Sequence, residues 1–235
     1  MPTGTAANAF LASKISFINA TAELCEKSGT DVQRVALGHD QRIGARGMRP
    51  GLGFGGGCLP KDLAGFTHRA EELGADQAAI LLRQVAAINQ QRREHTVELA
   101  RDTLGGTQTG KRITVWGAAF KANTDDIRDS PALAVATALH RTGAEVTVHD
   151  PSATENARRA YLALEYADDL TTAVIGDGLL LHLTDWPQYA EADPADLLMH
   201  IALMHIAPPG HRRPRHPQRR ALARTGWTLR ALGRP

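Results

Sequence analysis

Apolar residues recur at steps of three and four along the first hundred positions, a spacing that gathers them on one face of a helix. The first such run covers residues 6–28 and stops at Gly29, and glycine is common just past a helix end. Thr30 and Gln33 have the spacing of a capping box and predict the start of a short second helix. Helices are therefore expected over residues 6–28, 30–38, 60–73 and 76–104.

The pattern changes after residue 104. Two short runs rich in β-branched residues, 112–116 and 145–149, flank a segment typical of a helix at 131–143. A third apolar run covers residues 179–183 and follows a helix expected near 168–175. Strands that alternate with helices predict a parallel sheet with crossover helices. The fold class is α/β overall, with an all-α domain over residues 1–104 and a small Rossmann-like α/β domain over residues 105–197.

The composition excludes several classes of protein. With 43% hydrophobic residues in a chain of 235, there is enough apolar material for packed cores. The longest apolar candidate, residues 197–207, is far shorter than the roughly 20 residues that cross a bilayer, and the N-terminus has no secretory signal. Two cysteines, Cys25 and Cys58, are too few for a disulfide framework or a four-thiolate metal site. We therefore expect a reduced, cytoplasmic protein with no membrane partner and no metal ion.

Charge is distributed unevenly along the chain. The formal net charge is +2, but residues 211–235 hold eight arginines and no acidic residue, which leaves 19 basic against 25 acidic residues in the rest. The basic segment contains Trp227 as its single aromatic residue and no recognisable element for reading bases. We therefore expect no nucleic-acid partner.

The segment Gly-Leu-Gly-Phe-Gly-Gly-Gly-Cys-Leu-Pro-Lys-Asp, residues 51–62, carries the most informative chemistry. Its glycines let backbone amides approach a ligand, and it leads into a helix N-terminus, where the dipole favours anions and the thiolate form of a cysteine. Cys58 is therefore a candidate nucleophile, Lys61 adds positive charge, and Asp62, one helical turn later, is placed to activate a water. The alternative is that Cys58 is a small filler at a tight turn. Cys25 lies on an apolar helix face and is expected in the core.

Several segments in collinear order carry a resemblance to a known family. They are Asn8–Asn19, Asp40–Gly44, the cysteine segment, Gly117–Pro131 and His149–Pro151. Over about residues 6–197 the chain resembles the UDP-glucose 6-dehydrogenase family, within the UDP-glucose/GDP-mannose dehydrogenase superfamily and particularly its actinobacterial members.

The resemblance implies an NAD-dependent oxidoreductase of polysaccharide biosynthesis that converts UDP-glucose to UDP-glucuronate with two NAD, through a thiohemiacetal and a thioester on a cysteine. It assigns the nucleophile to Cys58, water activation to Asp62 and contacts with the reacting oxygens to Asn8. It also implies that the helical domain forms a homodimer and that the α/β domain binds the UDP-sugar.

The same resemblance implies ligand contacts for other residues. Arg42 matches an arginine that reaches a neighbouring subunit's substrate. The substrate-binding set is Arg42, Arg49, Gly51, Gly53, Phe54, Gly55, Phe120 and Lys121, and the set near NAD is Cys58, Lys61 and Arg128. The alternative for each basic residue is an ordinary solvated surface charge.

The chain departs from the family pattern in three places. The expected NAD-binding domain is absent, and the strand that ends at Gly117 is not followed by Gly-x-Gly-x-x-Gly. Gly4 stands where the family has a catalytic lysine. After about Leu197 the expected final strand is missing, so we expect a sheet that is incomplete at its C-terminal end and an aberrant His-, Pro- and Arg-rich tail over residues 198–235.

These departures leave three functions open. We expect a truncated dehydrogenase with little or no activity on its own, because positioning of the cofactor contributes much of the rate. The alternatives are a non-catalytic module for nucleotide-sugar binding or oligomerisation, and a homologue of the GDP-mannose 6-dehydrogenase type.

Overall fold

The computed structural model describes residues 3–32, 40, 42–44, 47–174, 178–192, 202–205 and 228–232. The chain divides into two compact units, a helical unit of Met1–Glu94 with Leu232–Pro235 and an α/β unit of His95–Ala231. The boundary between Glu94 and His95 lies inside one long helix, and the predicted division at residue 104 falls just after that helix ends. No helix in these described ranges is long and apolar enough to cross a membrane.

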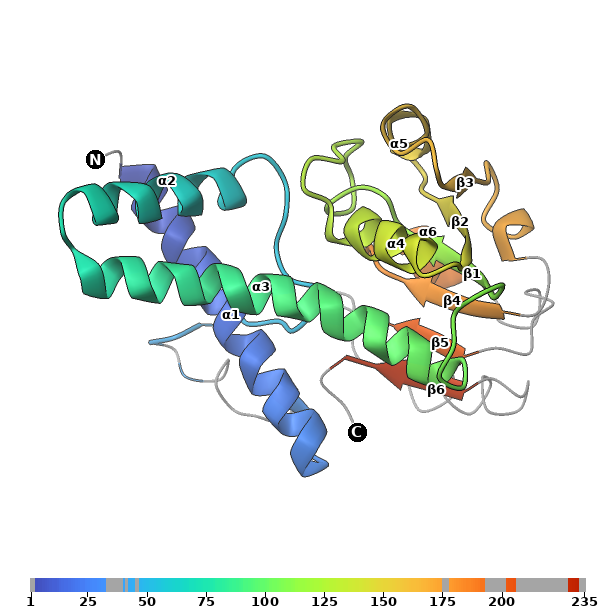
Figure 1. The fold of residues 1–235 in the computed structure, drawn as a ribbon, viewed down its shortest axis with the longest axis horizontal. Helices are drawn as coiled ribbons and strands as arrows, with labels where there is room; N and C mark the ends of the chain where they lie inside the picture. Colours follow the sequence, from blue (N-terminus) through green and yellow to red (C-terminus); the bar gives the residue numbers. More distant parts are fainter. Residues whose placement is uncertain are drawn as a thin grey trace. The chain divides into compact units, whose positions relative to one another are not determined.

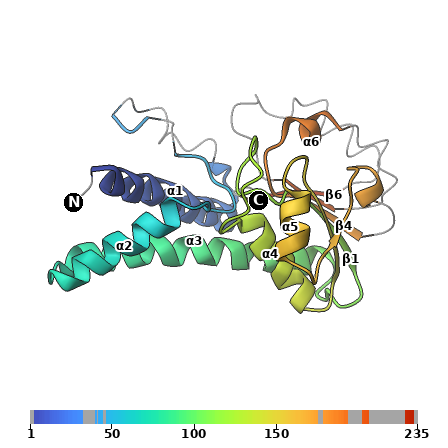
Figure 2. The ribbon, with the colours of Figure 1, turned by 90° about the horizontal axis from the view of Figure 1, so that it is seen from above.

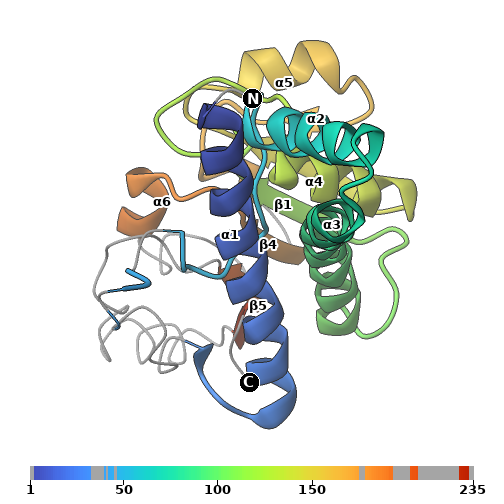
Figure 3. The same cartoon turned by 90° about the vertical axis from the view of Figure 1, so that its left-hand side faces the viewer.

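The helical unit contains α1 (Thr3–Ser28), α2 (Leu59–Glu72) and most of α3 (Asp76–Thr103), which confirms three predicted helices to within a few residues. Figures 1 and 2 show α2 and α3 as an antiparallel hairpin, and Figure 3 shows α1 running beside α2. The helix α1 ends at Ser28 and is followed by Gly29, whose φ of 72° favours glycine, and the Thr30 amide donates to the Cys25 carbonyl at 2.8 Å. The helix predicted over residues 30–38 falls mostly outside the described residues.

The main core cluster of the helical unit combines the three helices with one loop residue. Its main cluster contains Ala9 and Ala12 from α1, Phe54 from the loop, Leu63 from α2, and Leu82 and Val85 from α3. A second cluster along α1 includes Ile18, Ala22 and Cys25, so Cys25 is a core residue, as predicted.

The α/β unit is built on a six-stranded parallel sheet of order β3-β2-β1-β4-β5-β6. This is the strand order of a doubly wound Rossmann-like fold, which confirms the predicted fold class. The strands are β1 (Arg112–Trp116), β2 (Glu145–His149), β3 (Glu165–Tyr166), β4 (Gly178–His182), β5 (Ala202–His205) and β6 (Thr228–Ala231).

Burial explains why these runs form the centre of the sheet. Val115, Val148 and Leu181 are fully buried, as parallel strands covered on both faces require. Between β1 and β2 the chain crosses over through α4 (Pro131–Arg141), whose N-cap Ser130 accepts a hydrogen bond from the Leu133 amide. Figure 1 shows α4 beside β1 and β2, as predicted for a βαβ unit.

Two expectations for this unit are wrong. The sheet is not incomplete at its C-terminal end, because β5 pairs with β4 and β6 pairs with β5, both in parallel. The tail predicted to be aberrant thus supplies two strands, although residues 206–227 lie outside the described parts. In place of the helix near 168–175, the described residues form a 3₁₀ turn, η3 (Thr172–Val174), because the Asp169 carboxylate takes the amides of Thr171 and Thr172.

Three short elements of the α/β unit have no counterpart in the sequence analysis. They are α5 (Thr154–Ala160), β3, and α6 (Pro187–Glu191). Each is shorter than the stretch over which a repeated pattern can be recognised, roughly 11 residues for a helix and 4 for a strand, so pattern alone does not reveal them.

Candidate functional site

Cys58 stands at the N-terminus of α2, on the solvent side. Its thiol is free and exposed, whereas Cys25 is buried. Cys58 is the N-cap residue, Pro60 lies in the first turn, and the Asp62 amide donates to the Cys58 carbonyl at 2.8 Å. A cysteine that fills a tight turn would be enclosed by its neighbours, whereas Cys58 is exposed to solvent.

Asn8 and Asp62, which the sequence separates by 54 residues, meet through a hydrogen bond. Asn8 Nδ2 donates to Asp62 Oδ2 at 2.7 Å, and the pair is partly buried. The neighbours Ala9 and Leu63 both pack into the main helical core, so the packing of α1 on α2 sets this contact. The structure therefore places the three predicted catalytic residues on two adjoining helices, with Asp62 one turn after Cys58.

The glycine-rich loop before Cys58 is held by side chains that sequence reasoning missed. Asn19 Oδ1 accepts from the Gly51 amide at 2.8 Å, and Arg92 Nε donates to the Gly51 carbonyl at 3.0 Å. Asn89 and Arg93 bond the backbone of Phe54 in the same way. For the three α3 residues the available signal was their helical spacing, because polar residues at positions 89, 92 and 93 interrupt the apolar face and share one side of the helix.

Arg92 is the most deeply buried charge of this set. It is 4% exposed, and its Nη2 lies 3.1 Å from Glu26 Oε1. Burial lowers the pKa of Arg92, and the charge of Glu26 opposes that shift. One guanidinium thus joins α1, α3 and the loop.

The loop residues predicted to bind substrate differ in what they expose. Phe54 is 5% exposed and its ring lies in the core, so the ring is not available to a ligand. Gly55 is also buried, Gly51 and Gly53 are half-buried, and Arg49 is exposed. A ligand at this loop would therefore meet backbone and the Arg49 side chain.

Arg42 and Arg128, both predicted to contact ligands, are held in the same manner. Each follows an aspartate by two residues, donates its amide to that carboxylate, and pairs with it through Nε and Nη2. The bonds to Arg42 lower the pKa of Asp40, and those to Arg128 lower the pKa of Asp126. Lys14 Nζ also donates to the Ile43 carbonyl at 2.9 Å, which fastens the Arg42 turn to α1.

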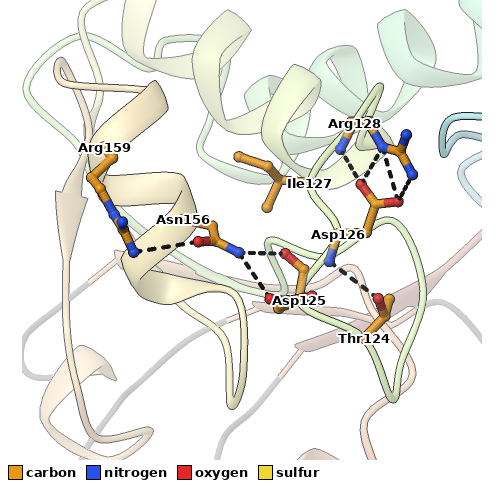
Figure 4. Close-up of a pocket in the computed structure, with 7 residues that line it drawn as sticks. All are labelled: Thr124, Asp125, Asp126, Ile127, Arg128, Asn156 and Arg159. Atoms are coloured by element: carbon orange, nitrogen blue, oxygen red, sulfur yellow. Dashed lines mark hydrogen bonds and ion pairs between the residues drawn. The ribbon is translucent and has the colours of Figure 1, made fainter.

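Within the α/β unit, the loop after β1 forms a polar hollow with α5. Figure 4 shows it lined by Thr124, Asp125, Asp126, Ile127, Arg128, Asn156 and Arg159. Asn156 Nδ2 donates to the Asp125 carbonyl at 3.0 Å, which ties the loop to α5. Earlier in the same loop, Lys121 is exposed and its Nζ lies 5.3 Å from the centre of the Phe120 ring.

A buried carboxylate occupies the position after β1 where a dinucleotide fold binds phosphate. Asp150 is 3% exposed, and its Oδ2 accepts from the amides of Ala118 and Ala119 at 2.8 and 3.0 Å and from Trp186 Nε1 at 3.1 Å. Its Oδ1 accepts from the amides of Ser152 and Ala153. The amides that would donate to a pyrophosphate already donate to Asp150, so the residues present here do not fit NAD.

Aromatic and imidazole side chains gather at the carboxyl ends of β1, β2 and β4. Tyr189 stacks on Trp116 with ring centres 4.8 Å apart, and His149 and His182 meet its ring edge-on. Burial lowers the pKa of His149, and the negative charges of Asp150, Asp169 and Asp168 partly offset that shift. Among the described residues, no three His, Cys, Asp or Glu side chains gather to hold a metal ion.

Comparison with known proteins agrees with this arrangement. Residues 3–91 match the central domain, and residues 114–205 the UDP binding domain, of the UDP-glucose/GDP-mannose dehydrogenase family. A UDP-glucose 6-dehydrogenase of Rhizobium meliloti is 42% identical over 190 residues, which cover 80% of this chain and 43% of the relative. The protein YwqF of Bacillus subtilis, also a UDP-glucose 6-dehydrogenase, is 40% identical over 184 residues, or 77% of this chain and 41% of that one.

Solved structures give the same result. A UDP-glucose dehydrogenase from Pyrobaculum islandicum superposes with a TM-score of 0.76 at 40% identity, over 81% of this chain and 44% of that one. The chain thus spans less than half the length of the relatives it matches. On sequence and fold together, the chain belongs to the UDP-glucose/GDP-mannose dehydrogenase family.

Proposed function

We propose that this chain supplies the nucleotide-sugar binding and covalent-capture parts of a cytoplasmic enzyme of the UDP-glucose 6-dehydrogenase type. One observation carries the proposal: Cys58 is exposed at the N-terminus of α2, and Asp62, one turn later, is hydrogen-bonded to Asn8. The names of the relatives favour UDP-glucose as the substrate.

The chemical role of Cys58 is to trap the sugar when C6 is an aldehyde. The sulfur of the thiolate bonds to C6, the carbon–oxygen π pair moves to oxygen, and that oxygen takes a proton to give a thiohemiacetal. Asn8 is near enough to Asp62 to orient its carboxylate, which suits the later activation of a hydrolytic water. The family resemblance assigns both hydride transfers to NAD, and the engaged amides of Ala118 and Ala119 offer it no site here.

Nucleotide-sugar binding is proposed for the loop before Cys58 and for the predicted basic residues. The amides of Gly51 and Phe54 already donate to Asn19 and Asn89, and the other backbone amides of the loop suit phosphate and sugar oxygens. Arg49 in the helical unit and Lys121 in the α/β unit are each an exposed cation of the kind that pairs with a phosphate. The match of residues 114–205 to a UDP binding domain supports the same ligand class.

We also propose that the chain forms a homodimer through α1. Phe10, Phe17 and Leu24 are 68%, 56% and 65% exposed and recur every seven residues, so they form one apolar stripe along the helix. A second copy of the same stripe is a complementary partner. Replacement of Phe17 by glutamate should convert the dimer to monomers in analytical ultracentrifugation, and a chain that is already monomeric would contradict the dimer.

Ligand protection of the thiol tests the catalytic proposal. Iodoacetamide should label Cys58 faster than the buried Cys25, and UDP-glucose should slow the labelling of Cys58 alone. At a UDP-glucose concentration about ten times Kd, occupancy slows labelling about tenfold. Cys58→Ser identifies the labelled site by mass spectrometry.

Parallel ligands separate the remaining functions. Stronger protection by GDP-mannose would favour the GDP-mannose 6-dehydrogenase type. Binding of UDP-glucose without protection of Cys58 would favour a non-catalytic module, and equal labelling of both cysteines would overturn the nucleophile. With UDP-glucose and NAD supplied together, we expect no NADH from the purified chain, and steady NADH formation would contradict the proposal that this chain supplies only sugar binding and covalent capture.

A further inference from the structure

The backbone of Phe54 is bonded on both edges by one buried side chain of α3. Asn89 Oδ1 accepts from the Phe54 amide at 2.7 Å, and Asn89 Nδ2 donates to the Phe54 carbonyl at 3.0 Å. Asn89 is 7% exposed, so water does not compete for either bond. A carboxamide offers a donor and an acceptor in one plane at any ordinary pH, so it can bond the amide and the carbonyl of one residue together.

Gly53, next to Phe54, lies against the same carboxamide. Its φ is 99°, and a Cβ placed there would stand 2.1 Å from Asn89 Oδ1. The close approach of backbone to amide therefore requires both glycine at 53 and a short carboxamide at 89.

Phe54, whose backbone Asn89 holds, is linked to the proposed catalytic residues through packing. The Phe54 ring shares its core with Ala9 and Leu63, the neighbours of Asn8 and Asp62. From Phe54 the chain reaches Cys58 through Gly55–Gly57, three residues without side chains, so the path is set by its two ends. One end is the start of α2, and the other is Phe54, whose backbone Asn89 holds.

We infer that Asn89 is a positioning residue, which fixes the glycine-rich loop so that its amides and Cys58 face a common ligand. This inference rests on the proposed function. Arg93 Nη2 also donates to the Phe54 carbonyl at 3.0 Å, but Arg93 has no acceptor to offer the amide, so it does not replace Asn89.

Variants at position 89 separate positioning from folding. Asn89→Ala removes both bonds, and Asn89→Asp keeps the acceptor for the Phe54 amide but loses the donor. Gln90→Ala is the matched control, because Gln90 is exposed on the next position of α3 and bonds Glu94 at the surface. Hydrogen exchange of the loop peptide, UDP-glucose affinity and labelling of the two cysteines are the measurements.

For Asn89→Ala we expect faster exchange confined to the loop and UDP-glucose affinity reduced about tenfold or more, because two buried hydrogen bonds that hold the loop are lost. Cys25 should stay protected, and Gln90→Ala should match the parent. Asn89→Asp should regain affinity as pH falls, relative to the parent at each pH, because a protonated carboxyl again donates to the Phe54 carbonyl.

Other outcomes would overturn either the positioning role of Asn89 or the proposed function. Unchanged loop exchange and affinity in Asn89→Ala, or no recovery of Asn89→Asp in acid, would overturn the inference. Exposure of Cys25 in both variants would show a structural role instead. If the parent chain does not bind UDP-glucose, the proposed function fails, while loop exchange still decides whether Asn89 positions the loop.

Discussion

The two units hold their loops by different means. In the helical unit, the loop before Cys58 is bonded by side chains of α1 and α3, so its shape depends on a few buried polar groups. In the α/β unit, loops leave the ends of a parallel sheet whose hydrogen-bonded ladders and apolar strands fix their starting points. Asp150 is the exception among these loops, since its single carboxylate accepts hydrogen bonds from backbone amides of the loops after both β1 and β2. The comparison indicates that point changes should damage the first region widely and the second chiefly at Asp150.

The largest effect is expected from Asp150→Ala. Five N–H groups would lose a buried, charged acceptor, and the free energy of unfolding of the α/β unit should fall by about 3 kcal/mol or more. The fluorescence of the buried Trp116 and Trp186 in urea measures it. Asp169→Ala is the control, because this aspartate takes amides at an exposed turn, and equal losses in both variants would refute the distinction.

The next effect is expected from Gly53→Ala in the helical unit. The added Cβ meets Asn89 and the positive φ is retained, so the unit should lose about 1–3 kcal/mol of stability. Gly65→Ala on exposed α2 meets nothing within 4 Å and should instead gain about 0.5–1 kcal/mol. The rate of Cys25 labelling in denaturant measures the stability of both variants. A Gly53→Ala variant as stable as the parent would show that the loop can change its conformation at little cost.

A smaller effect should depend on pH through His149. Burial holds its folded pKa below the ordinary 6.5, so the unfolded chain takes up the proton first as pH falls. The stability of the α/β unit should therefore be full above pH 6.5 and decline below it. His149→Asn should flatten that decline and His68→Asn, an exposed control, should not. Identical pH profiles for all three proteins would exclude His149 as the source.

The smallest effect on stability is expected at the two exposed arginine–aspartate pairs. Arg42 and Arg128 are solvent-exposed, and such ion pairs contribute little to folding. Arg42→Ala and Arg128→Ala should leave the thermal midpoint unchanged while weakening UDP-glucose binding or turnover in a complete enzyme. A marked loss of thermal stability in either would reveal a structural role.

Periodicity predicted the long elements and failed where side chains act on backbone. The helices α1 and α3 and the strands β1 and β2 are long or apolar enough for pattern to identify them. The 3₁₀ turn at Asp169 depends on a local carboxylate cap, which the spacing of apolar residues does not record. The strands β5 and β6 depend on pairing with β4 and with each other, which is a tertiary effect.

The site was predictable to a similar extent. Cys58 and Asp62 follow from one local motif, and their neighbourhood with Asn8 was implied by resemblance alone before the hydrogen bond was seen. The carboxamide of Asn89 bonds the backbone of Phe54, 35 residues away. The polar interruption of the apolar face at position 89 marks an unusual residue, but it does not identify the partner.

The contact between Tyr189 and His149 fixes the position of a proton. The Tyr189 hydroxyl donates its single hydrogen to the His149 carbonyl at 2.8 Å, so at His149 Nδ1, 2.9 Å away, the same hydroxyl oxygen must accept. The neutral ring therefore carries its hydrogen on Nδ1 and a lone pair on Nε2. Nitrogen NMR should find this tautomer, and loss of the phenol oxygen in Tyr189→Phe should free the imidazole to exchange between both forms.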